Sequence, residues 1–359
     1  MKHPYVGLPD RQFWKKEPGV LEAERLDPVS PPPFKIDPDD RIVTAGSCFA
    51  QHVARFMSNS GFNHHITERA HPLIAQPIAS RHNYGMFAAR YGNIYTARQL
   101  KQLFERAYGT FQPQAFSWPS SNVAGVVDPF RPQIQPGGYL SDAELEADRE
   151  SHFAAIRRAI EEMDVFVFTL GLTEAWVDTR DGAVFPIAPG VAGGSYDPET
   201  VAFKNFDDDE VYADMADALT FLREKRPDLR IILTVSPVPL NATFEDRHVL
   251  TSTVYSKAVL RVAAERCTKA FDNCVYFPSF DIITAPHVRG RYFDTDCREV
   301  LPAGVEHVMR LFLKHFTEGA DPSREPRPSS DEADRVEAHL RDMQEKMDVL
   351  CDEAAIDNR

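Results

Sequence analysis

Four short apolar runs along the chain have the length and composition of buried β-strands. Each run is rich in β-branched or aromatic residues and is followed by a turn of glycine, serine or proline. Continuous apolar runs of this length are typical of parallel sheets, whose strands are covered on both faces. The predicted strands span residues 41–45, 165–170, 231–235 and 275–277.

Between the strands, apolar residues recur at steps of three and four, which is the spacing of one helix face. Directly after the first strand, Phe49, Val53, Phe56 and Met57 follow this spacing. Because strand, turn and helix alternate, the pattern predicts an α/β fold with a doubly wound parallel sheet and helices on both faces. The other predicted helices span 96–108, 141–162, 208–225, 251–270 and 302–316.

Two stretches within the domain interrupt this alternation. Residues 110–140 are rich in proline, glycine and glutamine and are predicted to be an irregular insertion. Residues 175–206 contain Asp181-Gly182, a dipeptide typical of tight hairpin turns, and are predicted to form a small hairpin.

Two further segments flank the predicted domain at 41–317. Residues 1–40 are rich in proline and are predicted to be an extended arm on the domain surface. After a polar linker at 318–330, apolar residues in 331–356 alternate at steps of three and four, which predicts an amphipathic helix with a coiled-coil seam. This helix is expected to fold back on the domain, to join copies of the chain into a homo-oligomer, or to bind a partner protein.

Charge and composition narrow the classes of partner. The net charge is -14 and no cluster of lysine and arginine occurs, which argues against nucleic acid. No apolar run is long enough to span a membrane, and the first residues lack the apolar stretch of a secretory signal. A soluble, cytoplasmic protein without a membrane partner is therefore expected. The spacing of the 5 cysteines and 12 histidines matches no metal site, so neither a metal nor a resident cofactor is expected.

Candidate functional residues follow directly after the predicted strands. In doubly wound sheets, ligands bind outside the carboxyl ends of the strands. Four segments leave strands at that edge and carry small or polar residues, so they are expected to meet at one rim. They are 46–48, 171–174, 236–239 and 278–281.

The turn Gly46-Ser47-Cys48 lies between the first strand and the first helix. The N–H groups and the positive dipole end at a helix N-terminus lower the pKa of a thiol and can stabilise an oxyanion. This position favours Cys48 as a thiolate nucleophile. In the structural alternative, Ser47 caps the helix and Cys48 is a small buried residue.

The same turn carries a resemblance to a known family. The segment TAGSCFA at 44–50 contains the five-residue signature that names the GSCFA family. The resemblance covers roughly residues 40–316. It implies a flavodoxin-like three-layer sandwich and acyl-ester chemistry, as in the SGNH hydrolases with which the family is grouped. Further matching segments are YGNIY at 91–95, LGLTE at 170–174, TVSPV at 234–238, His248, YSK at 255–257 and YFPS at 276–279.

The resemblance also implies roles for single residues. SGNH enzymes use the serine of a Gly-Asp-Ser turn, and matching the glycines places Ser47 at the aspartate and Cys48 at the nucleophile. Cys48 is favoured, with Ser47 as the alternative. The implied oxyanion and substrate-binding residues are Gly92, Asn93, Gly171, Thr173, Glu174 and Ser236, with Thr173 in place of the usual asparagine.

The general base departs from the SGNH pattern. Those enzymes end in Asp-x-x-His, whereas Asp296 is followed by Glu299 at the histidine position. Without an imidazole a serine is poorly activated, which again favours a cysteine. His248 is the best replacement base, with Asp296 or Asp281 to orient it, and Glu299 itself is the alternative.

The sequence therefore predicts an acyl-transfer enzyme, either an O-acyltransferase or an esterase. Its expected substrate is a carbohydrate or another small hydroxyl-bearing molecule, and acyl-CoA is a candidate donor. The rival prediction is a non-catalytic carbohydrate- or acyl-binding protein that kept the fold and lost its base.

Overall fold

The computed structural model describes residues 3–17, 19, 22–121, 124–318 and 356. Apart from residues 318 and 356, the predicted linker at 318–330 and the predicted helix at 331–356 lie outside this described part. All three roles considered for that helix, including the joining of copies into a homo-oligomer, therefore stay predictions.

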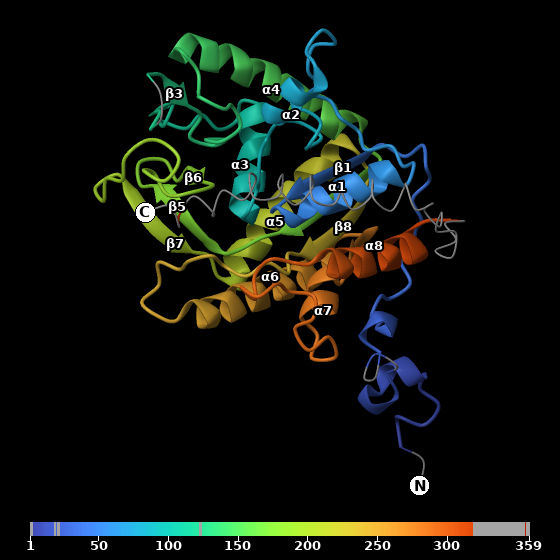
Figure 1. The fold of residues 1–359 in the computed structure, drawn as a ribbon. Coiled ribbons are helices and arrows are strands. Elements are labelled where there is room, and N and C mark those ends of the chain that lie inside the picture. The colour runs from blue at the N-terminus through green and yellow to red at the C-terminus, as the bar shows by residue number, and fades with distance from the viewer. Residues whose placement is uncertain (1–2, 18, 20–21, 122–123, 319–355, 357–359) are drawn as a thin grey trace.

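A four-stranded parallel sheet forms the centre of the domain (Figure 1). Its strand order is β1-β4-β8-β9, and every neighbouring pair is parallel. The four predicted strands are thereby confirmed in one sheet. Their bounds are β1 Ile42–Gly46, β4 Val165–Leu170, β8 Arg230–Val235 and β9 Cys274–Tyr276.

Segments that follow β1 in the chain pair with both of its edges. His64 forms a parallel bridge with Ile42, on the edge of β1 that β4 leaves free. The chain therefore first places a short extended segment on one side of β1 and then adds β4, β8 and β9 on the other. Such a reversal opens a crevice at the carboxyl ends of the strands on either side of it. This crevice is where the Gly46-Ser47-Cys48 turn emerges.

Helices cover both faces of the sheet, as the pattern predicted. Right-handed crossovers between strands that follow in order keep their helices on one face. These helices are α3 (Ala97–Ala107), α4 (Asp142–Glu162), α5 (Asp208–Lys225) and α6 (Val249–Ala270). The other face is covered by α1 (Phe49–Asn59) and α8 (Pro302–Phe316).

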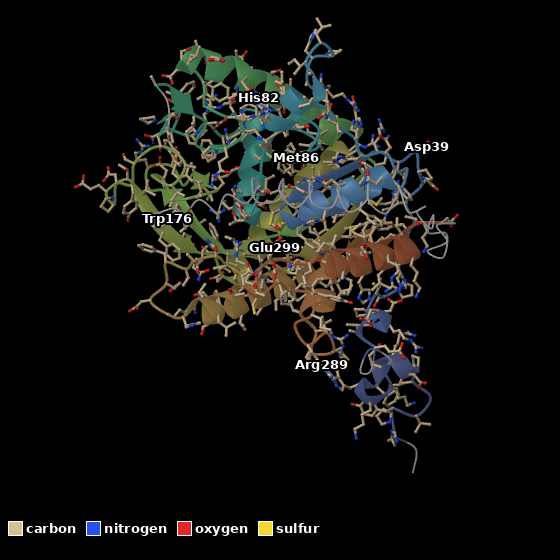
Figure 2. All side chains as sticks on the ribbon, viewed as in Figure 1. Asp39, His82, Met86, Trp176, Arg289 and Glu299 are labelled. Carbon is tan, nitrogen blue, oxygen red and sulfur yellow. The ribbon has the colours of Figure 1, made fainter. Side chains whose placement is uncertain are left out.

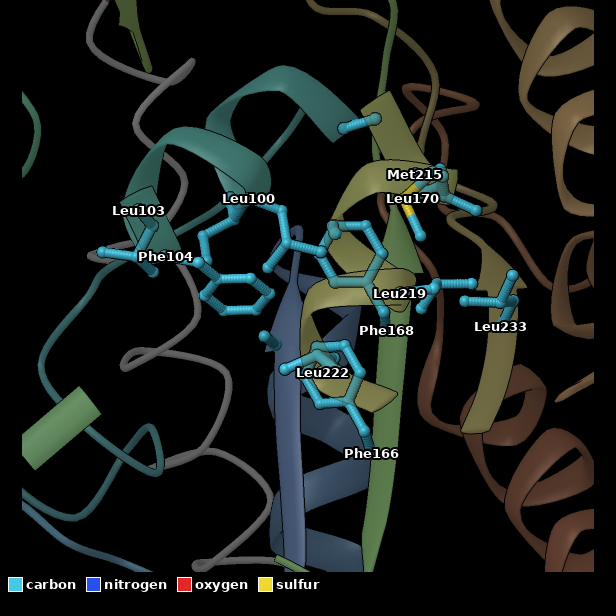
Figure 3. Packing of buried hydrophobic residues seen from close by; sticks show 14 of the residues in the cluster. Leu100, Leu103, Phe104, Phe166, Phe168, Leu170, Met215, Leu219, Leu222 and Leu233 are labelled. Carbon is cyan, nitrogen blue, oxygen red and sulfur yellow. The ribbon is translucent and has the colours of Figure 1, made fainter. Parts of the chain in front are cut away.

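The alternation of side chains along β4 divides the core into two layers. Phe166 and Phe168 pack with residues of α3 and α5 on one face (Figure 3). Val165 and Val167 pack with residues of α1 and α8 on the other. The strand is almost entirely apolar because both of its faces are buried, and its polar residue, Thr169, is also buried.

The two irregular stretches contain small antiparallel sheets. The predicted hairpin is present as β5 (Glu174–Asp178) and β6 (Val184–Phe185). A third strand that the pattern did not predict, β7 (Val201–Asn205), pairs with the other edge of β5. Within the insertion at 110–140, β2 (Trp118–Pro119) pairs with β3 (Val126–Val127). Two short helices were also missed, α2 (Gln76–Arg81) and α7 (Ser279–Thr284).

Part of the N-terminal arm is fastened to α8. The backbone N–H of Ile36 donates to the carbonyl of Phe316 at 2.7 Å. Asp27 pairs with Lys314 at 2.6 Å and with His315 at 2.9 Å. Residues 3–17 extend away from the sheet (Figure 1).

A buried ionic network fastens the insertion to α4. Arg90 is 1% exposed and pairs with Asp148 at 2.9 Å, and Arg131 pairs with Asp148 at 2.9 Å and with Asp128 at 3.0 Å. Glu68 accepts hydrogen bonds from the backbone N–H of Arg90 and from His152, both at 2.7 Å. Because these charges are buried together, removing one leaves its partners without compensation.

We expect Glu68→Gln to lower the free energy of unfolding by about 3 kcal/mol at neutral pH. Burial by itself would raise the pKa of Glu68, but His152, Arg131 and the N–H of Arg90 hold it at about 2. Wild-type stability should therefore decline as the pH falls from about 4.5 toward 2, since only the unfolded chain then binds the proton.

Urea unfolding at several pH values measures both effects. The Glu68→Gln protein should lose less stability than the wild type over that pH range. Glu146→Gln, which changes an exposed carboxyl on α4, is the matched control and should behave as the wild type. Equal pH dependence in the wild-type and Glu68→Gln proteins would contradict the prediction.

Candidate functional site

The turn after β1 is held in place by Gly46. Its φ is 131°, and a Cβ at this position would overlap the backbone of Thr169 in β4. The N–H of Ser47 donates to the carbonyl of Thr169 at 3.1 Å. Only glycine permits both the dihedral angle and the close approach. The two residues after Gly46 are therefore fixed against the end of β4.

We expect Gly46→Ala to lower the free energy of unfolding by about 3 kcal/mol or more, because it adds a clash to the backbone strain. Gly61→Ala is the matched control, since Gly61 also has a positive φ of 83° but open space around a Cβ. Its expected cost is about 1 kcal/mol. Denaturant unfolding compares the two, and equal losses would show that the contact with Thr169 is unimportant.

Ser47 and Cys48 differ in their surroundings. Ser47 is 3% exposed, and its Oγ has no hydrogen-bond partner among the described residues. Cys48 is half-buried and is the N-cap residue of α1, with φ −50° and ψ −31°. The interpretation of Ser47 as the capping side chain is therefore wrong, because its hydroxyl bonds no backbone N–H of α1. Leaving a buried hydroxyl without a partner is costly in a folded protein, so the Ser47 Oγ needs a partner from outside the described residues.

The segment at 91–95 connects the turn to β4. The N–H of Ile94 donates to the carbonyl of Gly46 at 2.8 Å. The N–H of Gly171 donates to the carbonyl of Tyr95 at 3.0 Å. Gly92 and Asn93 directly precede the residue that bonds to the turn, and their role in binding an oxyanion stays a prediction. The Asn93 side chain is buried and accepts a hydrogen bond from Gln51 of α1 at 3.0 Å.

Gly171 allows Ser47 to approach the backbone closely, but its N–H group is already bonded and is not available to an oxyanion. A Cβ at Gly171 would lie 3.1 Å from the Cβ of Ser47 and 3.0 Å from the carbonyl oxygen of Tyr95. Its N–H is already bonded to that carbonyl. The absence of a side chain therefore lets Ser47 lie against the end of β4.

Lys257 of α6 lies in the same small pocket, and the sequence analysis did not place it there. Its side chain is 3% exposed, and Nζ donates to the carbonyl of Gly171 at 2.7 Å. Ser47, Cys48 and Ser236 line this pocket with it. A lysine on the buried face of an amphipathic helix was the available signal, because such lysines are rare outside functional sites.

Thr173 and Glu174 form a second polar group beyond Gly171. The Thr173 hydroxyl donates to Asn205 at 2.7 Å, so its proton is used inside the protein. Glu174 accepts hydrogen bonds from the Thr243 hydroxyl at 2.6 Å and from the N–H of Phe244 at 3.2 Å. Burial raises the pKa of Glu174 above its ordinary value.

The structure does not bring His248 into the pocket of Ser47. His248 is the exposed N-cap residue of α6, and its Nδ1 accepts the N–H of Leu250 at 3.1 Å. It precedes Lys257 by nine residues, or about 13 Å along the helix. Its role as a base remains a prediction.

The remaining predicted residues lie in α7 and in the segment between α7 and α8. Asp296 is exposed and accepts the N–H groups of Arg298 at 2.8 Å and of Glu299 at 3.0 Å. Glu299 is half-buried and lies where the chain approaches α8 (Figure 2). Asp281 accepts the hydroxyl of Tyr276 at 2.7 Å, so this carboxylate is already bonded.

His52 is a further residue that the sequence analysis missed. It follows Cys48 by four residues, so the two side chains lie on one side of α1. Burial and the charge of Arg55 lower the pKa of His52 to about 4, which keeps the imidazole neutral at pH 7. The spacing Cys-x-x-x-His at the start of a helix was visible in the sequence.

Two further observations concern metal binding and membrane spanning in the described part of the chain. Three or more potential metal ligands do not gather anywhere among those residues. None of the described helices is both long enough and apolar enough to cross a bilayer.

The comparisons with known proteins identify one family. The model of the GSCFA family matches residues 41–312, which is most of the chain and includes every strand of the central sheet. No curated protein shows significant similarity to the chain.

Proposed function

The chain belongs to the GSCFA family, and on this premise we propose that it is an acyl-transfer enzyme with Cys48 as its nucleophile. The observation that carries this proposal is the pocket shared by Ser47, Cys48 and the buried Lys257 at the carboxyl ends of β1 and β4. A thiol at a helix N-terminus beside a lysine has the surroundings that favour a thiolate.

The proposed reaction has two steps. A general base takes the proton of the Cys48 thiol, and the thiolate attacks the carbonyl carbon of the acyl donor. As the new carbon–sulfur bond forms, the bond from that carbon to the leaving group breaks, and the leaving group takes the proton back from the protonated base. A hydroxyl group or water then attacks this thioester, loses its proton to a general base and releases the thiolate. During both steps, N–H groups at the start of α1 and at Gly92 would stabilise the oxyanion.

We infer that the acceptor is a hydroxyl-bearing molecule such as a carbohydrate, with acyl-CoA as a candidate donor. An aromatic cluster beside Glu174 supports this inference. Trp176 lies 4.8 Å from Phe244 between ring centroids, and Phe244 is 61% exposed. Exposed rings next to polar groups suit a ligand with one apolar face and several hydroxyls.

Intact-mass analysis after incubation with short acyl esters and with acyl-CoA tests the proposal. The expected result is a covalent adduct of the acyl mass that a Cys48→Ala protein does not form. Turnover without such an adduct would argue for direct transfer and against a covalent step.

His248 as the base stays a prediction from the sequence, because the structure places it outside the pocket of Ser47, and a pair of variants tests it. His248→Asn keeps a side chain that can cap α6 but removes the imidazole. If His248 is the base, this variant should lose about 10²–10⁴ in rate while keeping its stability. Glu299→Gln should matter less, because an ordinary carboxylate is a weak base. A dead Glu299→Gln enzyme beside an active His248→Asn enzyme would assign the base to Glu299.

The second candidate function is a non-catalytic carbohydrate- or acyl-binding protein. Two observations favour it: no histidine lines the pocket of Ser47 among the described residues, and the Thr173 hydroxyl is bonded to Asn205. Alkylation of Cys48 as a function of pH separates the two functions. A thiol pKa at the ordinary value near 8.5, without acylation by any donor, would favour the binding protein.

A further inference from the structure

A second cavity, larger than the pocket of Ser47 and Cys48, is lined in part by Gly92 and Asn93. Its volume is about 710 Å³, which lies within the range of pockets for small organic ligands. Apolar side chains from two separate parts of the chain form most of its wall. They are Met86, Phe87, Tyr91, Phe130, Ile134 and Pro136.

Two buried polar residues of this wall, Asn83 and Arg131, are bonded within the protein. Asn83 donates to the carbonyl of Ile134 at 3.0 Å. Arg131 is 5% exposed and is paired with Asp128 and Asp148. Arg81 also lines the cavity and is exposed, so a charge lies at its solvent side, whereas the buried part of the wall favours an apolar ligand.

Ser47 and Cys48 do not line this cavity, but a backbone hydrogen bond links its wall to their turn. Gly92 and Asn93 line it, and the next residue, Ile94, donates its N–H to the carbonyl of Gly46 at 2.8 Å. Gly46 directly precedes the Ser47-Cys48 turn. A carbonyl group held at that turn would therefore lie near one end of the cavity.

We infer that this cavity holds the hydrocarbon chain of the acyl group, so that the substrate is a medium- or long-chain acyl donor and not an acetyl donor. The inference rests on the proposed acyl transfer and specifies its substrate class. Each methylene removed from water into apolar surroundings should tighten binding about fourfold, until the cavity is full.

Binding of saturated fatty acids, from acetate to myristate, to the full-length Cys48→Ala protein tests the inference without any reaction. Isothermal titration calorimetry should show affinity that rises about fourfold per methylene and then levels off. Ser80→Trp places a bulky ring in the wall and should weaken binding of the longer acids at least tenfold. Ile78→Trp changes an exposed residue of the same helix that does not line the cavity, and should bind as the parent protein.

A third variant keeps the test informative if the Ser80→Trp protein does not fold. Met86, which Figure 2 labels, lines the cavity, and Met86→Ala should shift the best-bound acid toward longer chains. The inference is overturned if the acids do not bind saturably, which would indicate that another part of the protein fills the space. It is also overturned if Ser80→Trp and Met86→Ala both bind every acid as their parent does.

The same experiment separates this inference from the proposed function. Acylation of Cys48 by acetyl and long-chain donors at equal rates, without fatty-acid binding, would overturn the inference and leave acyl transfer intact. Graded binding that Ser80→Trp abolishes, without acylation of Cys48 by any donor, would overturn acyl transfer and leave the cavity as an apolar ligand site.

Discussion

The Cys48→Ala protein is expected to lose acyl transfer by a factor of about 10⁴ or more, while Ser47→Ala keeps measurable turnover. The thioester of the proposed reaction requires the sulfur of Cys48. Ser47→Ala removes a buried hydroxyl without a partner among the described residues, so its stability should change by less than about 1 kcal/mol.

Initial rates with the best donor, together with intact mass, measure this effect. Cys297→Ala removes an exposed thiol from the segment before α8 and serves as the control for nonspecific labelling. If Cys48→Ala remained active and Ser47→Ala were inactive, the nucleophile would be Ser47. The alignment of Gly46-Ser47-Cys48 with the Gly-Asp-Ser turn of the SGNH enzymes would then shift by one residue.

The second large effect is expected from Lys257→Met, which should lower the rate about 10²–10³-fold and move the alkylation profile of Cys48 to higher pH. A nearby positive charge favours the thiolate, so its removal disfavours the charged form of the thiol. The shift should be about one pH unit or more. Rates of iodoacetamide labelling between neutral and alkaline pH measure it.

Ser256→Ala is the matched control for this variant. Ser256 is the neighbour of Lys257 on α6, is buried, and accepts the N–H of Thr173 at 3.0 Å. Its loss removes one hydrogen bond but no charge, so stability should fall while the labelling profile stays in place. If the two variants had the same labelling profile, Lys257 would act through structure alone.

The fold could be predicted wherever the apolar pattern was long and regular. The predicted helices at 208–225 and 302–316 agree with α5 and α8 at both ends. A long amphipathic helix repeats its periodicity often enough to be recognised, and a strand buried on both faces forms a nearly continuous apolar run. Helices α2 and α7 have six residues each, too few for a period to repeat, and were missed.

The candidate site was only partly predictable. The sequence placed Gly46, Ser47, Cys48 and Gly171 at one rim, because parallel strands in one sheet present their carboxyl ends together. It did not assign Lys257 to that rim. The spacing of residues along a helix predicts which face is buried, but the contacts of one residue depend on how the helix packs on the sheet.

The sequence by itself determined the sheet, the helices on its two faces and the turn that presents Cys48. These features depend on local periodicity and on the strong preference for right-handed crossovers. Only the tertiary structure decided which charge accompanies the thiol and what surrounds it. The contact of Lys257 with Gly171 joins residues 86 positions apart. The wall of the large cavity brings Met86 together with Ile134, which belongs to the insertion at 110–140. Such contacts form because distant apolar segments share one core, and no local pattern encodes which distant residue will be the neighbour.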